Sequence, residues 1–277
     1  MTLNDADGPL AGMLQEIVEN RRRRVVESAQ TLVALPRETE AAPRTAANNP
    51  FLAALQRHRG RAVIAEIKLG SPRLGSLVDR IDPEVQARTY AKNGAAALSV
   101  VVEPDYFHGD YDLVSACREA AGGLPALAKD FVVDSLQLHW ARLAGADAVL
   151  LLAALHDTEG LWRLAQEARR LGLVPLIETH GAADLETLGD HPWELVGVNN
   201  RDLRTFEVDL DHSIAQVPRL PAGALKVAES GIRTGADIDR LAAAGFDAFL
   251  VGESLLLADD PGAQLRQLLA PEGSHGA

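Results

Sequence analysis

The stretch AVIAEIK, at residues 62–68, is a short apolar run that ends in charged side chains. Alanine, valine and isoleucine suit a strand that is buried on both faces, as the strands of parallel sheets are. Glu66 and Lys68 come at the C-terminal end of the run, where parallel-sheet α/β proteins place their chemistry. The stretch therefore predicts a parallel strand whose carboxyl end opens on a functional site.

The same arrangement recurs along the chain, with polar groups at the ends of apolar runs and helical patterns between the runs. Phrases that begin at Asn93, Ala144 and Ala244 each place a glycine at a helix end just before a strand, and their spacing fits units of about 25 residues. Eight such units predict an α/β fold of the (β/α)8 TIM-barrel type. The expected strands lie near residues 62–68, 97–103, 125–131, 147–154, 174–179, 195–200, 224–230 and 247–252.

A Rossmann-type sheet is the competing α/β architecture. It would require a turn of the G-x-G-x-x-G kind after an early strand, whereas residues 69–75 read LGSPRLG. The barrel is therefore preferred, and it is expected to occupy residues 61–270. Residues 1–60 are expected to form an N-terminal helical extension and residues 271–277 a flexible tail. Within the extension, helices are expected near residues 11–34 and 51–58, with a linker near 36–49.

Composition limits the possible functions. The 277 residues carry a formal net charge of −12, which opposes sequence-independent binding to nucleic acid. The basic run from Arg21 to Arg24 is interpreted as a solvated helix face, because Glu16, Glu19 and Glu27 flank it at helical spacings. The chain does not begin with a basic and apolar leader, and no apolar run is long enough to span a membrane. A cytoplasmic protein without membrane contact is expected.

Polar side chains at the carboxyl ends of barrel strands converge on one face. Such groups are costly to desolvate without a use, so a catalytic rim is favoured over a ring of ion pairs that only closes the barrel. Two late turns, ESG at residues 229–231 and GES at residues 252–254, offer backbone N–H groups to a phosphate. The expected rim contains Glu66, Lys68, Lys129, Glu178, Asn199, Glu229 and Ser230.

No metal site is predicted. The 8 histidines are scattered, without an H-x-x-x-H pair or a cysteine cluster. His180 is close to Glu178 in the sequence and is interpreted as a loop histidine without a catalytic role. A serine nucleophile is also disfavoured, because the chain has no G-x-S-x-G motif.

Several ordered motifs resemble those of the indole-3-glycerol-phosphate synthase family, and the resemblance runs from about residue 10 to residue 270. They are AEIK followed by SP, KDFV, LIE, GVNNRDL and AESGI, and the NNRDL and AESGI segments are highly specific together. The family closes the pyrrole ring of 1-(2-carboxyphenylamino)-1-deoxyribulose 5-phosphate, with loss of carbon dioxide and water, in tryptophan biosynthesis. The resemblance implies a lyase with a phosphorylated small-molecule substrate and no cofactor. Contact with other tryptophan-pathway enzymes is a further expectation.

The resemblance also implies catalytic roles for matching residues. Lys129 would protonate the substrate carbonyl, with Glu178 as its acid/base partner. Glu66 and Asn199 would orient the substrate and assist dehydration, and Lys68 would contribute to the charge balance and to the later acid step. The expected catalytic residues are Glu66, Lys68, Lys129, Glu178, Asn199 and Ser230.

Binding residues follow from the same resemblance. Ser71 and Arg201 would hold the anthranilate carboxylate, and the two glycine turns would hold the phosphate, with Glu253 acting through its backbone. The expected substrate-binding residues are Ser71, Phe107, Phe131, Arg201, Glu229, Gly231, Gly252 and Glu253.

The first loop departs from the family pattern. A basic residue usually follows the first-strand lysine and the turn usually reads SPSKG, whereas this chain has Leu69, Arg73 and Leu74. Arg73 is expected to replace the missing loop charge. The open alternatives are a related phosphate-binding isomerase, a Schiff-base aldolase that uses Lys129, a paralogue acting on a substituted anthranilate, and a non-catalytic barrel.

Overall fold

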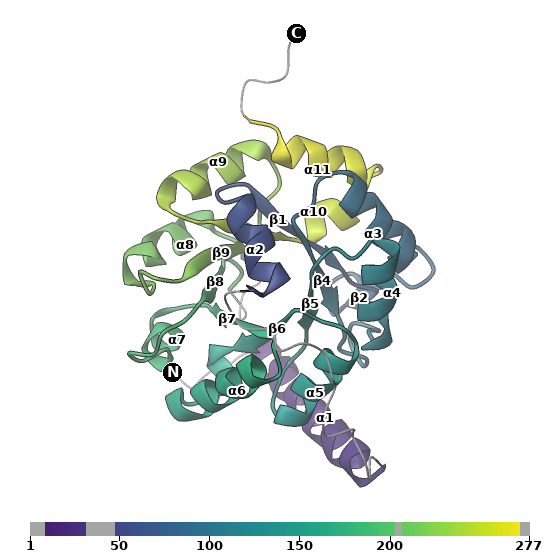
Figure 1. Ribbon diagram of the computed structural model, residues 1–277, viewed down its shortest axis with the longest axis vertical. Coiled ribbons are helices and arrows are strands. Elements are labelled where there is room, and N and C mark those ends of the chain that lie inside the picture. The colour runs from purple at the N-terminus through teal and green to yellow at the C-terminus, as the bar shows by residue number, and fades with distance from the viewer. Residues whose placement is uncertain (1–8, 32–47, 203–206, 272–277) are drawn as a thin grey trace.

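The computed structural model describes residues 9–31, 48–202 and 207–271. Eight parallel strands close into a barrel in the order β1, β10, β9, β8, β7, β6, β5, β4, and helices surround it (Figure 1). This closed barrel confirms the predicted (β/α)8 fold. The barrel strands are β1 (Ala62–Ile67), β4 (Ala97–Val101), β5 (Ala126–Lys129), β6 (Ala148–Leu152), β7 (Val174–Thr179), β8 (Leu195–Asn199), β9 (Leu225–Glu229) and β10 (Ala248–Val251).

A helix follows each barrel strand and packs outside it. These helices are α3 (Pro83–Lys92), α4 (Asp112–Ala120), α5 (Ser135–Leu143), α6 (Thr158–Arg170), α7 (Ala182–Thr187), α8 (Leu210–Gln216), α9 (Gly235–Ala244), and the pair α10 (Glu253–Leu256) and α11 (Pro261–Leu269). Short 3-10 helices cover Ala153–Leu155 and Val217–Arg219. The loop after β1 carries a hairpin of β2 (Gly70–Ser71) and β3 (Gly75–Ser76).

Two helices precede the barrel, α1 (Pro9–Thr31) and α2 (Pro50–Arg57). Most of the expected linker and of the expected tail lies outside the described residues, so the division of the chain into extension, barrel and tail stays a prediction. None of the helices in the described residues is long and apolar enough to cross a membrane.

Side chains of the strands alternate between the barrel interior and the outer helices. In β1, Ile64 packs in the interior, whereas Val63 and Ala65 belong to the apolar layer between the barrel and the helices. This period of two places Glu66 inside the barrel, one step nearer to the carboxyl end than Ile64. The strand is buried along its whole length, so the Glu66 carboxylate needs partners inside the barrel.

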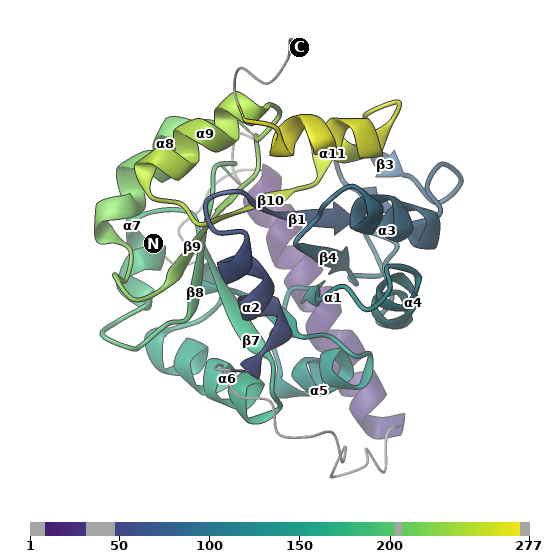
Figure 2. The ribbon, with the colours of Figure 1, turned by 45° about the horizontal axis from the view of Figure 1, so that its top comes forward.

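The two N-terminal helices lie at opposite ends of the barrel (Figure 2). Phe51 and Leu55 of α2 pack against interior residues from the beginnings of the strands, such as Ala62. By contrast, Leu14 and Ile17 of α1 line a cavity at the carboxyl ends. Helix α2 thus closes the floor of the barrel and α1 covers part of its mouth.

Asn49 joins α2 to the floor. Its side-chain oxygen accepts hydrogen bonds from the backbone N–H groups of Phe51 and Leu52 at 2.9 and 3.3 Å. Its Nδ2 donates to the carbonyl oxygens of Asp147 and Gly172 at 2.9 and 3.2 Å. One buried amide therefore caps a helix and satisfies two backbone carbonyls of the barrel.

We expect Asn49→Ala to lower the free energy of unfolding by about 2–4 kcal/mol, because it removes a helix cap and leaves buried backbone groups without partners. Asp82→Ala is the matched control, since Asp82 caps α3 through two backbone N–H groups near the surface, and it should cost about 1 kcal/mol. Urea unfolding measures both losses. Equal losses would contradict the assigned role of Asn49.

Candidate active site

A cavity of about 960 Å³ opens at the carboxyl ends of the strands. Helix α1 adds Met13, Leu14 and Ile17 to its wall, residues that sequence reasoning missed because nothing local in α1 indicates where it docks. Glu229 is the one predicted site residue outside the lining, and it lies beneath the cavity. The predicted residues that line the cavity are Glu66, Lys68, Ser71, Phe107, Lys129, Phe131, Glu178, Asn199, Arg201, Ser230, Gly231, Gly252 and Glu253.

Glu66 holds the two lysines of the site. Its Oε1 accepts a hydrogen bond from Lys68 Nζ at 2.8 Å, and its Oε2 accepts one from Lys129 Nζ at 2.9 Å. The Glu66 side chain is 6% exposed and the lysine side chains are 14% and 21% exposed. Gly252 makes room for the carboxylate, since a Cβ there would lie 2.3 Å from Glu66 Oε1.

These ion pairs set the ionisation of the groups. Burial alone would raise the pKa of Glu66, but Lys129 and Lys68 outweigh it and hold that pKa well below its usual range. Burial would lower the pKa of Lys129, whereas Glu66, Glu229 and Glu178 raise it above its ordinary value. Lys129 is therefore a charged ammonium group at neutral pH.

Glu178 lies one residue before the end of β7 and contacts Asn199 at the end of β8. Asn199 Nδ2 donates to Glu178 Oε1 at 3.1 Å, and the backbone N–H of Arg201 donates to Asn199 Oδ1 at 3.0 Å, which fixes the orientation of the amide. His180 Nε2 also lies 3.1 Å from Glu178 Oε1. The sequence interpretation places His180 close to Glu178 but assigns it no catalytic role.

Glu229 is a buried carboxyl group without ordinary partners. It is 1% exposed, and neither oxygen has a hydrogen-bond partner among the described residues. Lys129 Nζ lies 3.9 Å from Glu229 Oε2. Burial, followed by the negative charge of Glu178, raises the pKa of Glu229 well above its usual range. Glu229 therefore holds a proton more readily than an ordinary carboxyl group does, and its predicted contact with substrate stays a prediction.

The turn after β9 is held in a conformation that L-residues seldom adopt. Ser230 and Gly231 have φ angles of 68° and 78°, and Asn200 Nδ2 donates to the Ser230 carbonyl oxygen at 3.0 Å. Both residues line the cavity, together with Gly252 at the start of α10. The loops after the last two strands of a TIM barrel are where such barrels frequently bind a phosphate.

The first loop is tied to the last turn through Glu253. Arg73 Nη2 forms an ion pair with Glu253 Oε2, and Arg201 Nη2 lies 3.2 Å from the same oxygen. Arg73 and Leu74 both line the cavity, whereas Leu69 is 9% exposed and does not line it. Of the loop positions that depart from the family pattern, Arg73 thus presents a cation at the cavity.

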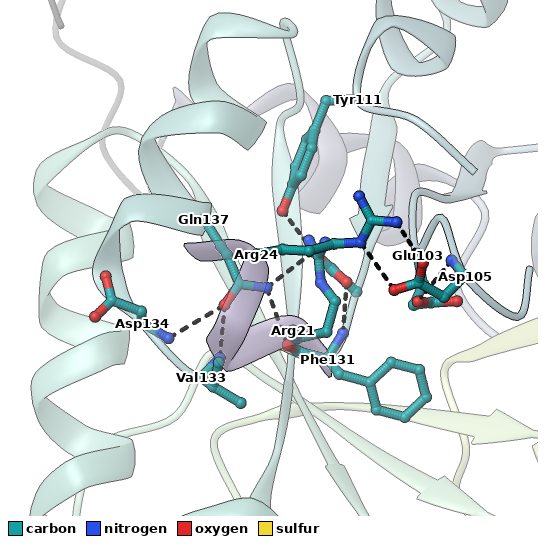
Figure 3. A network of polar contacts seen from close by, with 10 residues as sticks. Arg21, Arg24, Glu103, Asp105, Tyr111, Phe131, Val133, Asp134 and Gln137 are labelled. Atoms are coloured by element: carbon teal, nitrogen blue, oxygen red, sulfur yellow. Dashed lines mark hydrogen bonds and ion pairs between the residues drawn. The ribbon is translucent and has the colours of Figure 1, made fainter. Parts of the chain in front are cut away.

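The basic run in α1 does more than face solvent. Arg21 is 3% exposed and forms a buried ion pair with Asp130, while Arg24 bonds to Asp105 (Figure 3). The prediction of a solvated face is therefore wrong for Arg21. Arg21 is buried because of a non-local contact: its partner, the Asp130 carboxylate, comes from the end of β5, far away in the sequence.

Asp130 directly follows Lys129. Besides Arg21, it accepts hydrogen bonds from Tyr111 Oη at 2.7 Å and from Gln137 Nε2 at 2.9 Å. In Figure 3, Arg21, Tyr111 and Gln137 point toward one another from three elements. The chain just after Lys129 is consequently fixed by α1, the start of α4 and α5.

The chain is similar to known proteins in sequence and in fold. Residues 14–268 match the family described as indole-3-glycerol phosphate synthase. The enzyme of that name from Albidiferax ferrireducens is 40% identical over 269 residues, which cover 94% of this chain and 99% of that protein. The one from Carboxydothermus hydrogenoformans is 45% identical over 209 residues, or 75% of this chain and 79% of that protein. A crystal structure of 3-hexulose-6-phosphate synthase from Salmonella typhimurium shares the fold alone, with a TM-score of 0.60 and 15% identity over 75% of this chain and 96% of that chain.

Gly197 leaves the space that Glu229 occupies, since a Cβ at Gly197 would lie 2.1 Å from Glu229 Oε1. We expect Gly197→Ala to displace the Glu229 carboxyl and to lower catalytic activity by about 10²-fold. It should also cost about 1–3 kcal/mol of stability through overpacking. Gly223→Ala is the control, because a Cβ at Gly223 meets no atom within 4 Å. Enzyme assays and thermal unfolding of both variants measure the effects, and full activity in Gly197→Ala would contradict the prediction.

Proposed function

Because the chain belongs to the indole-3-glycerol phosphate synthase family, we propose that it converts 1-(2-carboxyphenylamino)-1-deoxyribulose 5-phosphate into indole-3-glycerol phosphate. The reaction is a ring closure with loss of carbon dioxide and water. The observation that supports it best is the charged Lys129 beside Glu66 in a cavity that also holds Glu178, Asn199 and the two glycine turns.

Ring closure places negative charge on the substrate carbonyl oxygen as the aromatic carbon attacks the carbonyl carbon. Lys129 gives its proton to that oxygen, and loss of carbon dioxide from the aromatic carbon that made the attack restores the aromatic ring. The role is supported by the carboxylates around Lys129, which keep it protonated until the substrate oxygen competes for the proton.

Dehydration needs a base for a ring proton and an acid for the departing hydroxyl group. We assign the base to Glu178, which is ionised because His180 and Lys129 outweigh the effect of burial on its pKa. Lys68 supplies the acid, and Glu66 and Asn199 orient the reacting groups through their contacts with Lys68 and Glu178.

The remaining cavity residues suit the two ends of the substrate. The turns at Ser230–Gly231 and Gly252–Glu253 bind the phosphate through backbone N–H groups. Ser71 and Arg201 bind the anthranilate carboxylate, and Phe107 and Phe131, whose ring centroids are 6.0 Å apart, pack against the aromatic ring. We also propose that the enzyme is cytoplasmic and that it contacts other tryptophan-pathway enzymes.

Formation of the fluorescent indole product from the carboxyphenylamino ribulose phosphate tests the function directly. A Schiff-base aldolase would instead form an imine at Lys129 that borohydride reduces. The raised pKa of Lys129 disfavours that alternative, because a protonated amine is not a nucleophile. Product formation without a trapped imine supports the proposal, whereas a trapped imine without the indole product contradicts it.

Lys129→Met should lower kcat by about 10²–10⁴-fold, with a smaller change in KM, because it removes the acid and leaves the phosphate turns intact. Lys129→Arg should not restore the rate, since a guanidinium keeps its charge but scarcely releases a proton. Steady-state kinetics of both variants check this. A Lys129→Met enzyme with near-normal kcat would move the acid to another group, with Lys68 as the next candidate.

Arg73→Ala should raise KM several-fold and flatten the salt dependence of kcat/KM, because one cation that faces the anionic substrate is lost. Arg80→Ala is the control, since Arg80 carries the same charge in the same loop but does not line the cavity. Leu74→Lys, added to Arg73→Ala, should recover part of the affinity, because Leu74 lines the cavity. Indistinguishable salt titrations for the wild type and Arg73→Ala would show that the loop charge has no role.

A further inference from the structure

His180 lies between two carboxylates just after β7. Its Nε2 is 3.1 Å from Glu178 Oε1, and its Nδ1 is 3.4 Å from Asp184 Oδ2. The side chains of His180, Glu178 and Asp184 are 15%, 5% and 10% exposed. The contacts are ion pairs rather than well-aligned hydrogen bonds, since neither ring nitrogen meets hydrogen-bond geometry. A ring with a carboxylate at each nitrogen is best stabilised as the imidazolium form.

The backbone around His180 is also fixed. Its N–H donates to Asp184 Oδ2 at 2.7 Å, so Asp184 contacts both the backbone and the ring. His212 Nε2 donates to the His180 carbonyl oxygen from the side of α8. The backbone of His180 is thus held from two sides, and its ring lies with Nε2 against Glu178.

Glu178 and Glu229 are two buried carboxyl groups that interact closely, and two such groups do not both ionise easily. Four groups act on Glu178: His180 beside it on the same strand end, Asn199 from β8, Lys129 from β5 and Glu229 from β9. The ion pair recorded for Glu229 among the described residues is with Lys129, whose Nζ lies 3.9 Å from Glu229 Oε2. The imidazolium lies against Glu178, so it lowers the proton affinity of Glu178 relative to that of Glu229.

We propose that His180, held by Asp184, is a positioning residue that keeps Glu178 ionised and leaves the proton of the carboxyl pair on Glu229. The role of this arrangement in the reaction rests on the proposed function, because it supplies the ionised base for dehydration. The charge state itself does not rest on that function.

The electrostatics agree with the geometry. Burial disfavours a charged imidazole, but Asp184 and Glu178 outweigh burial and raise the pKa of His180 to about 10. Burial would raise the pKa of Glu178 too, yet His180 and then Lys129 hold it below its usual range. Burial and Glu178 raise the pKa of Glu229. These shifts favour an imidazolium at His180, a carboxylate at Glu178 and the proton of the pair on Glu229.

Nitrogen-15 NMR of histidine side chains in the free enzyme tests the charge state without turnover. We expect the His180 ring, assigned by loss of its signals in His180→Gln, to remain imidazolium up to a midpoint near pH 10. Asp184→Asn should lower this midpoint, because it removes one of the two carboxylates. A wild-type midpoint below about 8 would overturn the proposal, since the histidine would then titrate near its unperturbed range.

The pH dependence of kcat tests the effect on Glu178. In His180→Gln the amide can still donate to Glu178 but carries no charge, so the pKa of Glu178 should rise. The acid limb of the kcat profile should then move to higher pH by about one unit or more. KM should change little, because His180 does not line the cavity.

His156→Gln is the matched control. His156 also lies at the carboxyl end of the barrel, and its Nε2 contacts the Val132 carbonyl oxygen at 3.1 Å rather than a carboxylate. The acid limb of the kcat profile of His156→Gln should stay at the same pH as in the wild type. A pH-independent loss of kcat in His180→Gln, or an unchanged profile, would mean that His180 only supports the fold. Failure of the wild type to form the indole product would reject the proposed function, whereas the NMR result would still decide the charge state.

Discussion

The ion pairs of Glu66 are the interaction on which the rest of the site depends. Without this carboxylate, Lys68 and Lys129 would be like charges in a largely buried place, and burial would favour loss of their protons. Glu66 belongs to β1 and Lys129 to β5, and β4 joins the two strands in the barrel. The position of the ammonium group therefore follows from the register of the strands, because the partners are fixed to the barrel wall rather than to mobile loops.

At two positions inside the barrel, a glycine leaves the space that a neighbouring buried carboxyl group occupies. The alternation along β8 and β10 directs Gly197 and Gly252 into the barrel, where side chains normally complete an interior layer. Here the space goes to the carboxyl groups of Glu229 and Glu66 instead, since a Cβ at either glycine would collide with one of them. The layer above the apolar core thus combines polar side chains from some strands with glycines, which have no side chain, from others. The apolar packing lost at these positions is the cost of bringing acids and bases together.

The sequence predicts what depends on periodicity and strand ends. The alternation and the glycine spacing predict the barrel, and the convergence of strand ends predicts that Glu66, Lys129 and Glu178 share one cavity. It does not predict what depends on non-local contacts. Arg21 has the same local pattern as a solvated arginine, and its burial follows only once α1 docks on the end of β5. The sequence partly indicates the contact between Glu178 and His180, because residues two apart on a strand share a side. It does not indicate that the second carboxylate on the His180 ring comes from α7.

Helix α1 lies outside the barrel sheet but contributes residues to the cavity. The barrel from β1 to β10 closes its own sheet, and its apolar layers do not require α1. Yet α1 supplies Leu14 and Ile17 to the cavity wall, and Arg21 binds the carboxylate that follows Lys129. A buried arginine without its partner is strongly destabilising, so the docked position of α1 is specified by the same residue that fixes the chain beside Lys129. The cover over part of the mouth and the fixed position of the chain after Lys129 therefore both depend on the ion pair of Arg21 with Asp130.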